Sequence, residues 1–275
     1  MPEHHLDSVR SIYDERSEQY DENQVHVKQA HDYVEWAQLR EGECVLDLAC
    51  GTGLVTLEAK RVVGPAGHVV GIDISDGMLN VARRKAGTEG VDVLFLNHDI
   101  ADLRGLDLLP EGKVGFDVIT CASALILLQQ PLEAVTMWKT LLSPGGRLVT
   151  DVQTKDANVV MNIFAAIAPE LGEEMPWNAQ QWQWQADLEQ LMVDAGLTVQ
   201  KIFETGAYAT THYDQRSAPE LFDQAVEKSM YKVFGREPVR AKAKALFLKH
   251  FTDIAGDEGV VSEECRFWVV VASLP

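Results

Sequence analysis

The sequence predicts a doubly wound α/β fold with a mostly parallel central sheet. Between residues 44 and 152, short apolar runs alternate with segments of helical spacing, which is typical of a parallel sheet with helices on both faces. The first run ends in a small-residue turn at 49–53, from which a helical pattern starts. Later strand ends carry Asp73, Asp99 and the segment 121–123. Because ligands of such sheets bind beyond the carboxyl ends of the strands, the same observations predict where a site lies.

The individual elements follow from apolar periodicity and from turn residues. Two helices are predicted before the first strand, over residues 6–38. Within the alternating region the pattern predicts strands at 44–48, 68–74, 91–99, 115–123 and, with its glycine turn, 143–153. Helices are predicted at 52–63, from 75 or 76 to 86, over part of 101–110, and from 131. Beyond residue 152 we expect helices at 157–177, 183–197, 217–234 and 237–254, and strands at 198–205 and 264–274.

Composition and charge narrow the class of function. The 275 residues suffice for a sizeable core, and their net charge of −18 disfavours nucleic acid and anionic membrane surfaces as partners. The sequence has no signal-peptide pattern and no apolar run that could insert into a membrane. The cysteines lack paired zinc spacing, which favours free thiols in a cytoplasmic protein: Cys44, Cys50, Cys121 and Cys265. We therefore expect a monomer or homodimer that acts on a small molecule.

Three ligand classes use a glycine turn after the first strand: nucleoside triphosphates, dinucleotides and S-adenosylmethionine. A triphosphate loop reads GxxxxGK[ST], and its lysine is missing here. The dinucleotide fingerprint needs a third glycine, but that position is Thr56 when counted from Gly51 and Leu54 when counted from Ala49. NAD is therefore the second choice of cofactor.

Five segments occur in order across residues 44–150: VLDLACGTG, VVGIDIS, NHDI, FDVITCAS and LLSPGGRLV. Together they resemble the motifs of class I S-adenosylmethionine-dependent methyltransferases, whose first motif usually reads (V/L)LD(L/V)GxGxG. The opening SIYDERSEQYDEN resembles the N-terminal cap of the ubiquinone/menaquinone-biosynthesis-like group. The resemblance is specific over 8–152 and loose over 184–205, and Ala49 stands where many members have the first glycine. It implies a Rossmann-like seven-stranded sheet with an antiparallel last strand, and methyl transfer to an O, N, S or C nucleophile.

The resemblance assigns the methionyl and ribose parts of the cofactor to the first motif. Asp47 would hold the methionyl ammonium, through water. The backbone at Ala49, Gly51 and Gly53 would line the methionyl and ribose parts, and the hydroxyl of Thr52 would lie near the carboxylate.

It assigns the other end of the cofactor to the next two strand ends. Asp73 would accept hydrogen bonds from both ribose hydroxyls, as an ionised carboxylate can. Ile74 and Met78 would offer apolar faces to adenine. Asp99 would accept from the adenine amino group, and the amide of Ile100 would donate to the ring.

Three further features concern the surroundings of the cofactor. Ala122 would contact its central region. Tyr13 and Tyr20 either pack their helix onto the domain or close over the cofactor, and Tyr20 is counted among the cofactor-binding residues. No His/Asp/Glu cluster has the spacing of metal ligands, and His98 beside Asp99 is a single local pair, so no metal is expected.

We expect one methyltransferase domain over 1–275, divided into a helical cap (1–40), a cofactor-binding core (41–152) and helical insertions at 153–183 and 206–263. The insertions would form a lid over an apolar or aromatic substrate, with lid packing or an oligomer contact as the alternative. Three tryptophans lie near the first insertion: Trp177, Trp182 and Trp184. The basic excess of 216–250 predicts a solvated helical face more than contact with an acidic substrate.

The acceptor needs a general base only if it must lose a proton. His212 and Tyr213, after the sixth strand, are the first candidates, and His98 is the second. Two other functions fit the same motifs: a cyclisation or rearrangement that uses S-adenosylmethionine without methyl transfer, and a non-catalytic module. The intact motif set disfavours the module.

Overall fold

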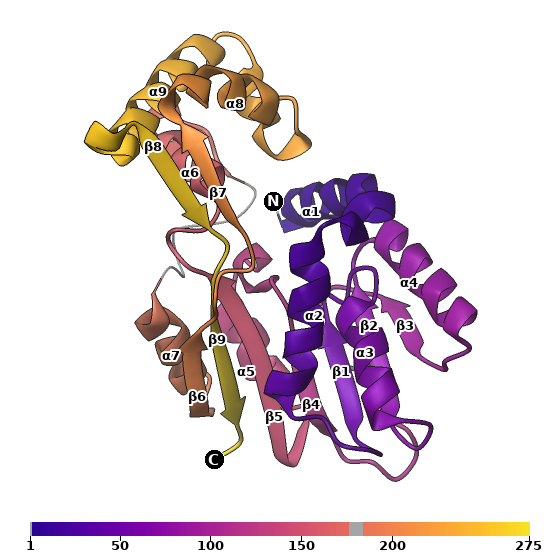
Figure 1. Ribbon diagram of the computed structural model, residues 1–275. Helices are drawn as coiled ribbons and strands as arrows, with labels where there is room; N and C mark the ends of the chain where they lie inside the picture. Colours follow the sequence, from indigo (N-terminus) through magenta and orange to yellow (C-terminus); the bar gives the residue numbers. More distant parts are fainter. Residues whose placement is uncertain (1, 176–183) are drawn as a thin grey trace.

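The computed structural model describes residues 2–175 and 184–275, apart from the side chains of 2–4. Its centre is a seven-stranded sheet in the order β3-β2-β1-β4-β5-β9-β6, in which β1 to β5 run parallel and β9 is antiparallel to both neighbours (Figure 1). The strands are β1 (Cys44–Leu48), β2 (His68–Asp73), β3 (Leu94–Asn97), β4 (Phe116–Cys121), β5 (Leu142–Gln153), β6 (Thr198–Glu204) and β9 (Phe267–Ser273). The predicted mostly parallel fold with an antiparallel last strand is confirmed.

Helices cover both faces of the sheet, which explains why its inner strands are apolar on both sides. On one face lie α2 (Gln24–Ala37) and α3 (Leu54–Val63), on the other α5 (Pro131–Lys139) and α7 (Gln185–Asp194), and α4 (Asp76–Glu89) packs beside β2 and β3. Alternate residues of β1 serve the two cores, because Val45 packs with α2 and α3 whereas Leu46 packs with Trp138 of α5.

A third group of helices forms a separate module, which we call the lid module. It contains α6 (Val159–Leu171), α8 (Ala218–Ala225) and α9 (Arg240–Ala255), and its core is a cluster of aromatic rings around Phe164. Figure 1 shows this module beyond the carboxyl ends of the parallel strands, on the same side as α1 (Pro2–Arg16). Ile12 of α1 belongs to the core of the module, so the N-terminal helix joins the lid module to the sheet.

The second insertion is not purely helical, contrary to the prediction for 206–263. β7 (Thr210–Asp214) and β8 (Val260–Glu264) pair as an antiparallel ribbon that leads into and out of the module. The predicted closing strand also starts later than residue 264, at Phe267. Each half of the ribbon has only five residues and its partner lies 45 or more residues away, so local periodicity gives little sign of the pairing.

The segment 101–110 contains turns and no helix. Leu103 and Leu108 are buried in the core of one sheet face, which accounts for the apolar spacing that looked helical. Gly105, at φ +79°, and Pro110 interrupt any helix there. The third strand and the helix after residue 157 are shorter than predicted, at Leu94–Asn97 and Val159–Leu171.

Candidate active site

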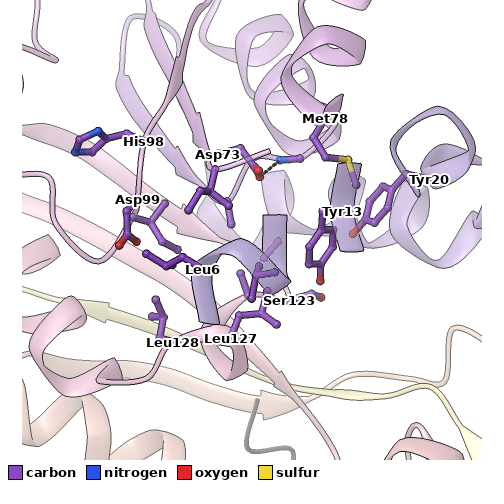
Figure 2. Close-up of a pocket in the computed structure, with 17 residues that line it drawn as sticks. Leu6, Tyr13, Tyr20, Asp73, Met78, His98, Asp99, Ser123, Leu127 and Leu128 are labelled. Carbon is purple, nitrogen blue, oxygen red and sulfur yellow. Dashed lines mark hydrogen bonds between the residues drawn. The ribbon is translucent and has the colours of Figure 1, made fainter. Parts of the chain in front are cut away.

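A pocket opens at the carboxyl ends of β1, β2 and β4, beneath α1 (Figure 2). Its empty space, mouth included, is about 670 Å³, which suits a small-molecule ligand. An adjoining smaller pocket of about 410 Å³ shares with it Tyr20, Ala49, Gly51, Ala122 and Ser123. We call these the large pocket and the small pocket.

The two pockets gather nearly all residues that the sequence predicts for cofactor binding. Besides the shared residues, the large pocket is lined by Asp73, Ile74, Met78, Asp99 and Ile100. The small pocket adds Asp47 and Thr52. Gly53 lines neither: it begins α3 at φ +79°, and a Cβ there would lie 3.1 Å from the Cβ of Ala82. Glycine is needed at this position because the turn packs closely against α4.

The turn after β1 lies between the two pockets. Ala49 and Gly51 both have positive φ values, 53° and 55°. A residue with a Cβ pays about 1 kcal/mol for this conformation, so Ala49 is held there by its surroundings. A Cβ on Gly51 would meet no atom within 4 Å, which means that it would project into open space at the site. Glycine here keeps that space free for a ligand close to the backbone.

Asp73 ends β2 and joins the turn to the next helix. One carboxylate oxygen accepts a hydrogen bond from the amide of Gly51 at 2.8 Å, and the other accepts from the amide of Ser75 at 2.8 Å. Burial raises the pKa of Asp73, while the backbone donors act against that rise. The carboxylate has lone pairs beyond these two bonds, so it can still accept from a ligand hydroxyl.

Asp47 and Thr52 reach the small pocket from the first motif. Asp47 is 1% exposed and accepts hydrogen bonds from the hydroxyls of Thr56 (2.5 Å) and Thr120 (2.8 Å). Burial raises its pKa to about 6, although both hydroxyls favour the charged form. The hydroxyl of Thr52 donates to Asp21 of the N-terminal cap at 2.5 Å and is therefore already engaged.

A buried polar network beside the pockets was not foreseen from the sequence. Asp151, 1% exposed at the end of β5, accepts from Tyr33, from Gln29 (3.1 Å) and from the amide of Ser123 (2.7 Å). Burial raises the pKa of Asp151 to about 6. Ser123 lines both pockets and has a positive φ of 54°, so the network fixes a strained residue at the site. The signal was available, because Asp151 is an acidic residue at a strand end, like Asp73.

His26 was also missed. It lies on α2, lines the small pocket and stacks on Tyr20 with ring centroids 4.3 Å apart and planes 6° from parallel. Its Nε2 atom is buried without a hydrogen-bond partner within the described part of the chain. Burial lowers the pKa of His26 to about 4, so the ring is neutral at neutral pH.

These features fit S-adenosylmethionine, the cofactor that the sequence predicts. The glycine turn leaves room for a ligand. The buried carboxylates of Asp73 and Asp47 can accept hydrogen bonds from hydroxyl and ammonium groups. The buried Nε2 of His26, which has no partner among the described residues, can bind a polar group. Ile74 and Met78 supply the apolar surface in the large pocket.

The predicted general bases are less favourably placed. His98 lines the large pocket, but its Nε2 is bonded to the carbonyl of Asp102 at 2.8 Å, and Figure 2 shows its ring directed away from Tyr13 and Tyr20. His212 and Tyr213 lie on β7 and line neither pocket: His212 pairs with Ser262 at 2.9 Å, and Tyr213 donates to Glu263. Within the described part of the chain these hydrogen bonds are to structural neighbours, and the role of the three residues as general bases stays a prediction.

Three other predictions concern the lid module and metals. Trp177 and Trp182 lie outside the described residues, whereas Trp184 is 55% exposed and has the Lys155 ammonium 4.8 Å above its ring. In the basic segment, Arg240 and Lys244 form ion pairs with Asp223. Within residues 2–175 and 184–275, no three His, Cys, Asp or Glu side chains are grouped so that they could hold a metal ion.

Comparisons with known proteins agree with the motifs. Residues 45–146 match the family model described as a methyltransferase domain. The chain is 31% identical over 187 residues to the ubiquinone/menaquinone biosynthesis C-methyltransferase UbiE of Saccharophagus degradans, covering 66% of this chain and 72% of that protein. Its fold is similar to that of the YcgJ protein from Bacillus subtilis (TM-score 0.59, 20% identity, 90% of this chain and 99% of that one). It is also similar to that of the [4+2]-cyclase SpnF (TM-score 0.53, 18% identity, 90% and 81%).

Proposed function

Because the chain belongs to the S-adenosylmethionine-dependent methyltransferases of the ubiquinone/menaquinone-biosynthesis-like group, we propose that it methylates a small apolar or aromatic molecule bound beside the cofactor. The observation that carries this proposal is the apolar wall of the large pocket. Opposite the cofactor residues of the sheet, this wall is formed by Leu6 and Val9 of α1 and by Leu127 and Leu128 after β4. The relative from Saccharophagus is a quinone-biosynthesis C-methyltransferase, which favours a phenol or hydroquinone ring as the acceptor.

In this proposal the protein acts by alignment. When bound, S-adenosylmethionine supplies a methyl group on a positively charged sulfur, which leaves as a neutral thioether. Asp73 would hold the ribose, Asp99 and Ile100 would hold adenine, and Asp47 would hold the methionyl ammonium, all from positions that line the two pockets. Alignment of nucleophile, carbon and sulfur then supplies most of the acceleration.

The residues around the wall do not favour a strong general base. Tyr13 and Tyr20 line the large pocket, but burial raises the pKa of both hydroxyls, so they are poor proton acceptors at neutral pH. This favours an acceptor whose attacking atom is electron-rich before it loses its proton, such as a ring carbon of a hydroquinone, with the proton then released to water.

The cyclase alternative is not favoured. The likeness to the cyclase has 18% identity and concerns the fold, whereas the 31% identical relative is a methyltransferase. The family also disfavours NAD as the cofactor, in agreement with the missing third glycine.

Methyl transfer can be tested with S-adenosylmethionine labelled on its methyl group. The full chain is incubated with a short-chain hydroquinone, a simple phenol, a thiol and an amine, and labelled product and S-adenosylhomocysteine are both measured. We expect label on the hydroquinone or the phenol. Label on the thiol or amine alone would contradict the proposed acceptor class, while cofactor binding without label on any acceptor would count against methyl transfer.

A further inference from the structure

His26 lines the small pocket and carries a buried hydrogen-bonding atom, Nε2. Among the residues that the structure describes, none hydrogen-bonds this nitrogen, and the ring of His26 lies nearly parallel to that of Tyr20. An unsatisfied buried polar atom costs about 1–3 kcal/mol, so such an atom at the wall of a binding pocket points to a ligand group as its partner.

Four other polar side chains of that pocket already have hydrogen-bond partners. The hydroxyl of Thr52 donates to Asp21, the amide nitrogen of Gln29 donates to Asp151, and the hydroxyl of Ser123 donates to the amide oxygen of Gln29 at 3.1 Å. Asp47 accepts from two threonines. These groups are therefore less available to a carboxylate of a ligand that enters the pocket.

We infer that His26 donates a hydrogen bond from Nε2 to the α-carboxylate of the methionyl part of S-adenosylmethionine. The inference rests on the proposed function, in which the adenosine part lies in the large pocket and the methionyl part reaches across Gly51 into the small one. The methionyl part carries an ammonium and a carboxylate. With Asp47 on the ammonium, the carboxylate still needs a donor, and His26 lines the small pocket with a buried ring nitrogen that no group in residues 2–175 and 184–275 hydrogen-bonds.

The chemistry of a neutral imidazole suits this place. Burial lowers the pKa of His26, so the ring carries one N–H and one lone pair at neutral pH. When Nε2 carries the proton, it donates to the carboxylate without a second buried charge. The stack on Tyr20 fixes the ring plane before the ligand arrives, which reduces the loss of side-chain freedom on binding.

The test compares two nucleosides that differ only in the carboxylate. S-adenosylhomocysteine has it, and S-adenosyl-3-thiopropylamine keeps the ammonium but lacks it. Dissociation constants are measured by calorimetry for the wild-type chain and for His26→Phe, which keeps an aromatic ring for the stack on Tyr20. His31→Phe is the matched control, because His31 lies on the same helix but is exposed and lines neither pocket.

We expect His26→Phe to weaken the binding of S-adenosylhomocysteine about 10- to 100-fold, the range for a hydrogen bond to a charged group. The binding of the thiopropylamine should weaken less than about twofold. The melting temperature of the ligand-free variant should equal or exceed that of the wild type, because an unpaired buried nitrogen is removed. His26→Gln, whose Nε2 can reach a similar position, should restore part of the preference for the carboxylate. It also serves as the second variant if the phenylalanine variant folds poorly.

Other outcomes would overturn the inference. Equal losses for both nucleosides would mean that His26 acts through packing or through the ammonium. An unchanged affinity for S-adenosylhomocysteine in His26→Phe would mean that the nitrogen is satisfied by water. If the wild-type chain bound neither nucleoside, the proposed function itself would fail, and this result is distinct from a loss confined to His26 variants.

Discussion

At the scale of single residues, three buried carboxylates lie near the carboxyl ends of β1, β2 and β5, with β4 between β1 and β5. Asp47, Asp73 and Asp151 belong to or follow β1, β2 and β5, and burial raises the pKa of each. Each is stabilised by hydroxyl, amide or backbone donors. The fold therefore maintains costly buried acids at the edge where a polar ligand is proposed to bind, which is the arrangement expected of a binding site.

Asp73→Asn should strongly weaken the binding of S-adenosylhomocysteine. An amide cannot accept at both ends, so either the Gly51 or the Ser75 amide would face an NH2 group, and the charged acceptor for the ribose would be lost. Loss of hydrogen bonds to a charged group, at about 1.5–3 kcal/mol each, predicts a loss of affinity of about tenfold or more. Asp76→Asn is the control, because Asp76 is exposed three residues later. Calorimetric affinities that fell equally in both variants would contradict the role of Asp73.

Asp47→Asn should change stability and binding in opposite directions. Folding raises the pKa of Asp47 from 3.8 to about 6, so between these values the native state binds more protons than the unfolded chain. The free energy of unfolding therefore falls as the pH rises from about 4 to 6. The hydroxyls of Thr56 and Thr120 can rotate to accept from an asparagine amide, so the variant avoids this loss. We expect it to be up to about 3 kcal/mol more stable than the wild type at pH 7.5, and nearly equal at pH 4.

Denaturant unfolding at the two pH values measures the stability of Asp47→Asn, and calorimetry with S-adenosylhomocysteine measures its weaker binding. Asp92→Asn, at an exposed position, should show neither effect. A variant that was destabilised at pH 7.5 would show that the charge of Asp47 supports the fold, against this prediction.

At the scale of elements, hydrogen bonds and an ion pair join the N-terminal helices to the start of α4 and to Lys85. The carboxylate of Asp14 in α1 accepts from the hydroxyl of Ser75 (2.5 Å) and the amide of Gly77 (2.9 Å), at the start of α4. Arg10 donates to the carbonyl of Ile74 at 3.3 Å, and Lys85 of α4 pairs with Asp21 at 2.7 Å. These contacts thus hold α1 over the same residues that line the large pocket.

Asp14→Ala should loosen α1 from α4. The loss of a carboxylate from a helix N-terminus costs about 1 kcal/mol, and here it also leaves the Ser75 hydroxyl without its acceptor. We expect faster hydrogen exchange in residues 2–16 and faster dissociation of S-adenosylhomocysteine, both in the range of a few-fold. Glu15→Ala, at the exposed neighbouring position, is the control. If hydrogen exchange in residues 2–16 rose while the dissociation rate of S-adenosylhomocysteine stayed unchanged, the contacts of α1 with α4 would not affect the cofactor site.

Elements with strong local patterns were predictable, and elements defined by remote partners were not. The run around Val45 and Leu46 is apolar except for Asp47, and it forms the strand β1, which is buried at every position. The turn at Gly51 and the capping serine Ser75 were likewise readable from residue type alone. The pairing of β7 with β8 brings together residues separated by α8 and α9, which no short window contains.

The same distinction applies to the site. Residues at strand ends, such as Asp73 and Asp99, were placed correctly at the pocket because parallel strands share one carboxyl edge. His26 and Gln29 come from a helix that precedes the sheet, and only the packing of α2 onto β5 brings them to the small pocket. His212 looked suitable by type and position, but β7 carries it away from both pockets.

At the scale of the whole molecule, the lid module has a core separate from those of the sheet. The ring of Phe164 is fully buried and lies 4.6–5.8 Å, between centroids, from four other rings: Phe222, Tyr231, Phe234 and Phe247. By contrast, the large pocket receives its polar residues from the sheet and its apolar wall partly from α1 and from Leu127, which also packs against the module. Leu127 packs against the sheet core as well, so the proposed acceptor wall depends on both cores, whereas Asp73 and Asp47 belong to the sheet alone.

Phe164→Ala should separate methyl transfer from cofactor binding. Removal of a buried phenylalanine costs about 3–5 kcal/mol, enough to unfold the lid module locally while the packing of the sheet remains. We expect affinity for S-adenosylhomocysteine to stay within about twofold, because Asp73 and Asp47 are untouched, and labelled methyl transfer to the acceptor to be lost. Phe164→Leu, which refills most of the volume, should restore transfer. A parallel loss of cofactor affinity and transfer in Phe164→Ala would show instead that the module and the sheet fold as one unit, and would place the acceptor wall within the same cooperative core as the cofactor site.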